Sequence, residues 1–264
     1  MEKIKFLEKK NRPWVIAHRG YRSSFPENTF SAFEAAIEVK ADMIELDVSL
    51  SRDRVPVVIH DKKLDRTTDG EGLVADFSIS ELKELDAGSW FNKEFKGEKI
   101  PTLEETLDLI KGRINVNIEI KPESFEISEP MDAIEIQVCK LIERLKMEDQ
   151  VIISSFEHSF FGRIQNFCKK SNKLNFIRIA PLLDVFQNKE FILSICRRAK
   201  AYSFHPNSSF LTESLILELK AAGYKIFPYT INENYRMKEL IKSGVSGIIT
   251  DEPEKLRELI KKVK

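Results

Sequence analysis

Short apolar runs alternate with amphipathic segments along the whole chain. Runs of this length and composition predict buried β-strands, and the segments between them predict helices. The second strand region contains two runs in close succession, "MIELDVSL" at 43–50 and "VPVVIH" at 55–60. The predicted strand segments are 14–18, 43–50, 55–60, 114–120, 151–156, 174–180, 201–205, 224–230 and 246–251, which make eight strand regions.

The segment 28–40 illustrates the helical pattern, because its apolar side chains fall on one face. Asn28 is expected to cap this helix. Further helices are predicted near 102–111 and 130–146. Eight strand regions, each followed by a helix, predict an α/β fold, the (β/α)8 TIM barrel, rather than two domains. A mixed or doubly wound sheet is the alternative, but it would have to explain the strand count.

One segment breaks this alternation. Residues 62–101 hold one short helical stretch and many turn-forming residues, and they are too many for a loop between a strand and a helix. We expect a small inserted subdomain after the second strand, over the C-terminal face of the barrel, where active sites of such barrels lie. It could serve there as a lid. The alternative is an inert decoration stabilised by Trp90 and Phe91.

Composition and charge narrow the function classes. The 42 basic residues balance 42 acidic ones, so no global field favours nucleic acid or an anionic membrane surface. The three cysteines are widely spaced in helical patterns, as core residues of a reducing compartment are. The N-terminus lacks the apolar core of a signal peptide, and no run approaches the ~18 apolar residues of a membrane span. We therefore expect one domain over residues 1–264, soluble and cytoplasmic, with no nucleic-acid partner and no integral membrane association.

Polar side chains lie in or directly after the predicted strands, where a barrel carries its catalytic groups. Because residues two apart in a strand point the same way, Glu45 and Asp47 share a face, and so do Glu119 and Lys121. Three carboxylates from neighbouring strands match the oxygen ligands that Mg²⁺ or Ca²⁺ prefers. The alternative is a buried salt-bridge network with nearby basic residues, which is costly in a barrel interior unless the charges are used.

Two histidines supply candidates for acid–base chemistry. His18 and His60 each end an apolar run, and such a pair could take a proton from a nucleophile and return one to a leaving alcohol. Arg19 and Lys121 could hold the anionic oxygens of a phosphoryl group. Together with the carboxylates, these residues predict a metal-assisted phosphodiester hydrolase.

Seven stretches follow one another in order: "AHRGYRSSFPENTFSAF", "IELDVSLSRDRVPVVIHDKKLDRTTDGEG", "LDAGSWFNKEFKGEKIPTLEE", "NIEIKPE", "SSF", "YTIN" and "GIITDEP". Across nearly the whole chain they resemble the glycerophosphodiester phosphodiesterase family. The resemblance implies a TIM barrel with an inserted subdomain. It also implies hydrolysis of glycerophosphodiesters to sn-glycerol 3-phosphate and an alcohol, with dependence on Ca²⁺ or Mg²⁺.

The resemblance also assigns roles to residues of this chain. The implied metal ligands are Glu45, Asp47 and Glu119; the catalytic histidines are His18 and His60; the phosphate-binding groups are Arg19 and Lys121. Which histidine is the base stays open. The nucleophile also stays open between water and the glycerol 2-hydroxyl of the substrate, which would give a cyclic phosphate that water then opens.

Further substrate contacts are expected from aromatic residues. The family commonly has Trp-Thr-Val-Asn late in the barrel, where this chain has "YTIN", beginning at Tyr229. Trp90 and Phe91 of the insertion are also candidate substrate contacts, and His205 is a weaker one. We expect a small-molecule glycerophosphodiester as the partner and a monomer or homodimer as the assembly. The sequence does not choose the headgroup or the cation.

Three further acidic residues have two candidate roles each, and for two of them one role is to orient another side chain. Glu27 is expected to orient Arg19 or His18, or else to complement the dipole of the following helix. Asp61 either orients a histidine or caps a turn. For Asp251, capping of the last helix beside Pro253 is favoured over binding at the barrel mouth.

Other function classes fit the residues less well. A phosphoinositide-specific phospholipase C would need a lipid-facing rim, and this chain has no obvious apolar patch for one. A glycoside hydrolase could use paired carboxylates, but would leave two histidines and Lys121 unexplained. A lysophospholipase D is closer, and a binding protein without turnover is a further alternative. Metal-dependent turnover would separate the enzyme from the binding protein.

Overall fold

The computed structural model describes residues 11–171 and 177–262. Its strands are β1 (Trp14–His18), β2 (Met43–Leu50), β3 (Pro56–Val58), β4 (Asn115–Ile120), β5 (Val151–Ser155), β6 (Arg178–Leu183), β7 (Ser203–Pro206), β8 (Lys225–Ile226) and β9 (Gly247–Thr250). Its α-helices are α1 (Phe30–Glu38), α2 (Ile79–Glu84), α3 (Leu103–Ile110), α4 (Ile134–Leu145), α5 (Ser159–Lys170), α6 (Lys189–Arg198), α7 (Glu213–Ala221), α8 (Asn234–Ser243) and α9 (Pro253–Lys262). Four short 3₁₀ turns are η1 (Val74–Asp76), η2 (Lys93–Phe95), η3 (Pro122–Ser124) and η4 (Ser208–Phe210).

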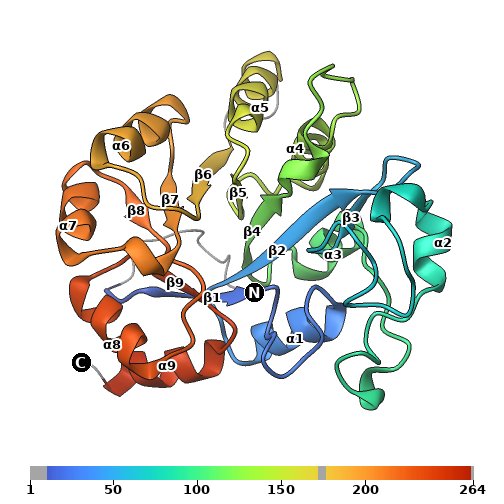
Figure 1. The fold of residues 1–264 in the computed structure, drawn as a ribbon, viewed down its shortest axis with the longest axis horizontal. Coiled ribbons are helices and arrows are strands. Elements are labelled where there is room, and N and C mark those ends of the chain that lie inside the picture. Colours follow the sequence, from blue (N-terminus) through green and yellow to red (C-terminus); the bar gives the residue numbers. More distant parts are fainter. Residues whose placement is uncertain (1–10, 172–176, 263–264) are drawn as a thin grey trace.

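The strands form a parallel barrel inside a ring of helices (Figure 1). They follow one another in the order β8-β7-β6-β5-β4-β2-β1-β9, and β3 pairs antiparallel with β2, off this path. Backbone hydrogen bonds from Ser246 to Ile226 and from Ile249 to Pro228 join the two ends of the order. The predicted (β/α)8 TIM barrel is therefore confirmed.

Alternation along the strands separates the core from the site. On β2 the apolar Ile44, Leu46 and Val48 belong to the core between strands and helices, so Glu45 and Asp47 point into the barrel. The same alternation on β4 buries its apolar side chains outward and turns Glu119 inward. A separate apolar cluster fills the inside of the barrel, made by Trp14, Ile16, Met43, Ile152, Ala180, Phe227 and Ile249.

Two predicted strands are displaced or shortened. The prediction at 174–180 falls partly outside the described residues, and β6 runs from Arg178 to Leu183, where it pairs with β5 and then β7. The strand predicted at 224–230 is reduced to Lys225–Ile226. Pro228 follows it and has no N–H to donate to the ladder.

Thr29 caps α1, so the prediction for Asn28 is wrong by one residue. The Thr29 side chain accepts the N–H of Ala32, and Thr29 has the extended backbone of a cap. Asn28 instead has a φ of +58° and donates its side-chain N–H to Asp47 Oδ2 at 3.0 Å. The amide predicted to serve the helix therefore contacts the acidic residues of the barrel.

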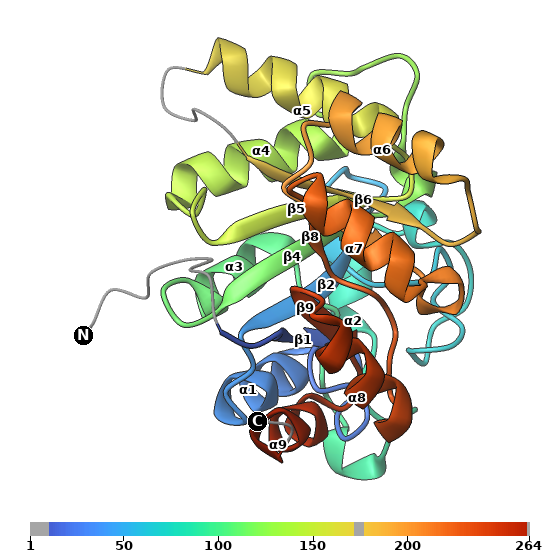
Figure 2. The same cartoon turned by 90° about the vertical axis from the view of Figure 1, so that its left-hand side faces the viewer.

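The segment 62–101 contains η1, α2 and η2 and packs around an apolar cluster that it forms together with Val57 and Ile59. Aromatic contacts link Trp90 to Phe91, Phe91 to Phe95, and Phe95 to Phe25 of the loop after β1. Figure 2 shows the loops of this segment, in cyan, on the side toward which the strand arrows point. The segment therefore lies at the C-terminal ends of the strands, as predicted.

The three cysteines are buried and free, as predicted for core residues. Each belongs to a helix that packs against the barrel, α4, α5 or α6. No helix within the described residues is long and apolar enough to cross a lipid bilayer.

The turn after β1 requires a glycine. Gly20 has a φ of +85°, and a Cβ there would lie 2.7 Å from the backbone of Ala32 in α1. Left-handed backbone is unfavourable for other residues by about 1–2 kcal/mol, and the close approach to a helix backbone adds to this.

We expect Gly20→Ala to lower the free energy of unfolding by about 2 kcal/mol or more. The control is Gly162→Ala in α5, where a Cβ meets no atom within 4 Å and should stabilise by about 0.5–1 kcal/mol. Urea denaturation of both variants checks this expectation. A Gly20→Ala protein as stable as wild type would contradict it.

Candidate active site

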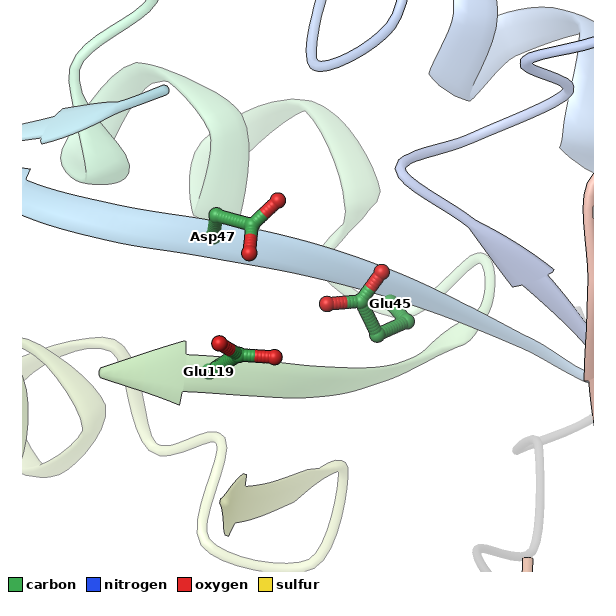
Figure 3. A group of neighbouring side chains, drawn as sticks. All are labelled: Glu45, Asp47 and Glu119. Carbon is green, nitrogen blue, oxygen red and sulfur yellow. The ribbon is translucent and has the colours of Figure 1, made fainter. Parts of the chain in front are cut away.

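Three carboxylates meet inside the barrel. Glu45 and Asp47 come from β2 and Glu119 from β4, and their side chains converge between the two strands (Figure 3). Asp47 and Glu119 are partners in the parallel register, which explains why side chains so distant in sequence meet. One oxygen from each of the three buried carboxylates lies within 4.8 Å of the others. We call these three residues the carboxylate triad.

The negative charge of the triad is only partly balanced by nearby positive charge. Burial raises the pKa of Glu45 well above its usual value, and the charges of Asp47 and Glu119 raise it further. Burial and the Asp47 charge also raise the pKa of Glu119, to about 7. Glu45 Oε1 is buried and accepts no hydrogen bond from the described residues. An all-oxygen set with an orphaned carboxylate oxygen fits a divalent cation such as Ca²⁺ or Mg²⁺.

Two basic residues lie against the triad. Arg19 Nε is 3.2 Å from Asp47 Oδ2, and the Arg19 backbone N–H donates to Glu45 Oε2 at 2.9 Å. Lys121 Nζ donates to Glu119 Oε1 at 2.8 Å and to Asp47 Oδ1 at 3.4 Å. Although burial opposes ionisation of Asp47, Arg19 and Lys121 hold its pKa below the usual range. The predicted phosphate-binding residues therefore contact the predicted metal ligands directly.

His18 ends β1 and pairs in register with Glu45. Its Nδ1 lies 2.6 Å from Asp251 Oδ1. Burial alone would raise the pKa of Asp251, but the hydrogen bond from His18 lowers it to about 2. The Asp251 carboxylate is therefore ionised and can only accept a hydrogen bond, so His18 Nδ1 carries the proton. Burial lowers the pKa of His18 itself. The neutral ring thus presents Nε2, which lies 3.9 Å from Glu45 Oε2, as a proton acceptor.

His60 is held in the same way near Asp47 of the triad. Ile59 donates its N–H to the Asp47 carbonyl at 3.1 Å, which places the following His60 beside the triad. His60 Nδ1 lies 2.5 Å from Asp61 Oδ1. Hydrogen bonds from Arg66 and His60 lower the pKa of Asp61 to about 2, so His60 Nδ1 also carries the proton. Both histidines therefore have a carboxylate behind Nδ1 and leave Nε2 for chemistry.

Glu27 connects the two histidine sites. Its side chain is only 2% exposed and accepts from Arg19 at 2.8 Å, as the sequence suggested. Arg22 bridges Glu27, at 2.8 Å, and Asp251, at 3.3 Å. Arg66 bridges Glu27 and the carboxylate that holds His60, each at 2.7 Å. Three arginines around one buried carboxylate thus join the loop after β1 to the segment 62–101.

Sequence reasoning missed several of these contacts. The expectation that Asp251 caps the last helix is wrong, since its carboxylate binds His18 and Arg22. Asn232 supports it, because its side-chain N–H donates to Asp251 Oδ2 at 2.8 Å. Asn28 was predicted as a cap, although it contacts Asp47. One feature of the sequence could have pointed to these contacts: the three polar residues lie within the stretches "PENT", "YTIN" and "TDEP".

The aromatic candidates lie in two places. Tyr229 packs edge-on against Phe156, with ring centroids 6.0 Å apart. Burial, followed by the charges of Asp184 and Glu119, raises the pKa of Tyr229, so its ring lies within electrostatic reach of the triad. Tyr229 follows β8, and its backbone is hydrogen-bonded to Pro206 and Ser208 at the end of β7.

Trp90 and Phe91 belong to the segment 62–101. Trp90 is 37% exposed, packs edge-on against Phe91 and lies 6.0 Å from the Arg66 guanidinium. These rings connect to the site through Arg66. His205 is fully buried and bonds Ser203 inside the barrel, so it offers no surface to a substrate.

Comparisons with known proteins agree with this geometry. The chain matches the model of the glycerophosphoryl diester phosphodiesterase family over residues 18–255. A glycerophosphodiester phosphodiesterase of Caldanaerobacter subterraneus subsp. tengcongensis is 42% identical, over 94% of this chain and 98% of its own length. One from Bacillus subtilis is 33% identical, over 92% of this chain and 85% of its own length.

A solved structure extends the comparison to three dimensions. An Oleispira antarctica phosphodiesterase, in complex with the product sn-glycerol-3-phosphate, superposes with a TM-score of 0.84 at 30% identity. The match covers 95% of this chain and 97% of that one. Barrel, triad and comparisons together define a phosphoric diester hydrolase. The chain belongs to the glycerophosphodiester phosphodiesterase family, so the resemblance of its seven stretches is confirmed.

The raised pKa of Glu45 gives a prediction for the metal-free protein. An acid whose folded pKa lies above its unfolded value opposes folding increasingly as the pH rises from the unfolded to the folded pKa. Relative to Glu45→Gln, metal-free wild type should therefore lose stability as the pH rises from about 5 to about 8. Urea denaturation in chelator at the two pH values measures this change.

The exposed Glu84→Gln serves as the control for that experiment and should change stability little at either pH. If the free energies of unfolding of wild type and Glu45→Gln differ by the same amount at pH 5 and pH 8, the pKa of Glu45 is not raised by folding.

Proposed function

We propose that this enzyme hydrolyses glycerophosphodiesters to sn-glycerol 3-phosphate and an alcohol, with a divalent cation on the triad and the two histidines as acid and base. The observation that carries the proposal is the matched support of two histidines, each with a carboxylate at Nδ1. Both lie near three carboxylates whose oxygens lie within 4.8 Å of one another. Histidines held in this way keep a fixed tautomer and orientation, as a proton donor and acceptor must.

Glu45, Asp47 and Glu119 would hold the cation, either Ca²⁺ or Mg²⁺. When bound, it neutralises charge on the phosphoryl oxygens and makes the attacking oxygen more acidic. Arg19 and Lys121 contact the carboxylates and supply part of the compensating charge. With a cation held by the triad, both side chains would be available to the phosphate of the substrate, Arg19 with a planar guanidinium suited to two oxygens.

His18 and His60 divide the proton transfers between them. One accepts a proton at Nε2 from the nucleophile, and the other, protonated at Nε2, gives one to the leaving alkoxide. Asp251 and Asp61 stabilise the ring that becomes charged. Since the two sites have equivalent partners, geometry leaves the choice of base open, together with the choice between water and the glycerol 2-hydroxyl as nucleophile.

Several broader expectations belong to the same proposal. We infer one barrel domain over the chain, with the segment 62–101 as an inserted subdomain that contributes Arg66 to the site. Trp90, Phe91 and Tyr229 are proposed as substrate contacts near the mouth. Buried free cysteines suit a reducing compartment such as the cytoplasm. Monomer or homodimer stays a prediction.

The first test is product formation. Purified enzyme with Ca²⁺, Mg²⁺ or Mn²⁺ should release sn-glycerol 3-phosphate from glycerophosphocholine or glycerophosphoethanolamine, detected with a coupled dehydrogenase. A lysophospholipid is offered as a further substrate. If the enzyme released its headgroup but released no sn-glycerol 3-phosphate from the two diesters, the result would favour a lysophospholipase D. No product from any diester with any of the three cations would contradict the proposal.

The second test concerns the histidines. His18→Ala and His60→Ala should each lower kcat by about 10²–10⁴, because each removes a proton-transfer group. The control is His158→Ala, whose ring bonds the Leu182 carbonyl at 3.0 Å outside the site and whose kcat should match wild type. Near-wild-type turnover in both site variants would rule out the acid–base scheme.

A further inference from the structure

A cavity of about 450 Å³ lies at the C-terminal ends of β2 and β4 and plays no part in the scheme above. Its wall is shared by the turn after β2, by η1 of the segment 62–101 and by the residues after β4. The residues that matter below are Ser49, Lys62, Leu73 and Glu123. We call it the rim cavity.

Three wall residues follow site residues at a spacing of two. Ser49 follows Asp47, Lys62 follows His60, and Glu123 follows Lys121. These segments lie side by side, because Ile59 donates to the Asp47 carbonyl and Lys121 donates to the Val48 carbonyl, both at 3.1 Å. Of the three, Ser49 lies in a strand, β2, and two residues of extended chain advance about 7 Å. At Ser49 the wall of the rim cavity therefore lies about that far along the strand from Asp47.

Two charges in the wall are unpaired. Arg52 is bound to Glu81 at 2.8 Å and Arg54 to Glu126 at 2.7 Å, so these arginines are already neutralised. The exposed side chains of Lys62 and Glu123, by contrast, have no hydrogen-bond or ion-pair partner among the described residues. The cavity thus offers one free cation and one free anion.

Glu123 also lies close to the site along the chain. It belongs to the turn η3, two residues after Lys121, whose ammonium contacts the triad directly. A group attached to a phosphate on Lys121 would therefore lie near the Glu123 side chain. Leu73, which is 39% exposed, gives the wall an apolar part that can cover methylene carbons.

We propose that the rim cavity binds the leaving alcohol and favours one that carries both an ammonium and a carboxylate, as a seryl group does. Glu123 meets the ammonium and Lys62 the carboxylate. The glycerol half of the substrate is uncharged and would have no use for two unpaired charges, so it belongs on the other side of the phosphate. This inference rests on the proposed function and specifies its substrate.

The test compares three diesters of sn-glycerol 3-phosphate, with serine, ethanolamine and glycerol as the alcohol. The values of kcat/KM should fall in that order, by about three- to tenfold at each step, as expected for single charge contacts near a surface. Lys62→Gln should bring the serine-to-ethanolamine ratio close to one. Glu123→Gln should do the same to the ethanolamine-to-glycerol ratio. The differences in kcat/KM between the diesters should come from KM, with kcat nearly unchanged.

Two variants outside the cavity wall serve as matched controls. Lys63→Gln and Glu84→Gln each remove one exposed charge of the same sign and should leave all three ratios at wild-type values. This separates contact with the alcohol from a change in overall charge.

The outcomes separate this inference from the function beneath it. If wild type hydrolyses the three diesters equally, or prefers glycerol, or if both cavity variants keep the wild-type ratios, the inference is overturned while the hydrolase stands. If none of the diesters is hydrolysed, the proposed function itself fails and the inference with it.

Discussion

The structure depends on one electrostatic constraint: three carboxylates buried within 4.8 Å of one another inside a barrel. Such a group is strongly unfavourable without compensating charge. Arg19 and Lys121 supply part of it, and the raised pKa values of Glu45 and Glu119 show that they do not supply enough. A site that folds with unmet negative charge is prepared for a divalent cation. The other polar contacts of the site surround these carboxylates and hold the groups that would act on a bound phosphate.

The barrel can hold these carboxylates because they are placed by its strands. β2 and β4 bury apolar side chains outward and direct carboxylates inward, so the same alternation that forms the core also assembles the triad. The histidines come from β1 and from the residues after β3, and each is fixed by the carboxylate behind it. Glu27 then ties the surrounding arginines together. Local strand geometry thus places the reactive groups, and long-range ion pairs hold them still.

Much of this could be predicted from the sequence. The count of apolar runs predicted the barrel. The period of two along a strand predicted that Glu45 and Asp47 share a face, and Glu119 and Lys121 another, so carboxylates from neighbouring strands could be expected to meet. Contacts across the chain could not be predicted in this way. Asp251 and Asn28 look like helix caps locally, but fold topology brings them to His18 and Asp47. The strand predicted at 174–180 stopped short of the end of β6, because Pro181 is unusual inside a strand, although the apolar Leu182 and Leu183 continue it.

The most direct measurement is the rate of sn-glycerol 3-phosphate release by chelator-treated enzyme as Ca²⁺ or Mg²⁺ is restored, in wild type and in Glu45→Ala. If the triad holds a required cation, wild type should be inactive in chelator and recover saturably with added cation, whereas Glu45→Ala should recover little at any concentration. Full turnover by wild type in chelator, or normal recovery by Glu45→Ala, would contradict the account that the carboxylate triad is the centre of catalysis.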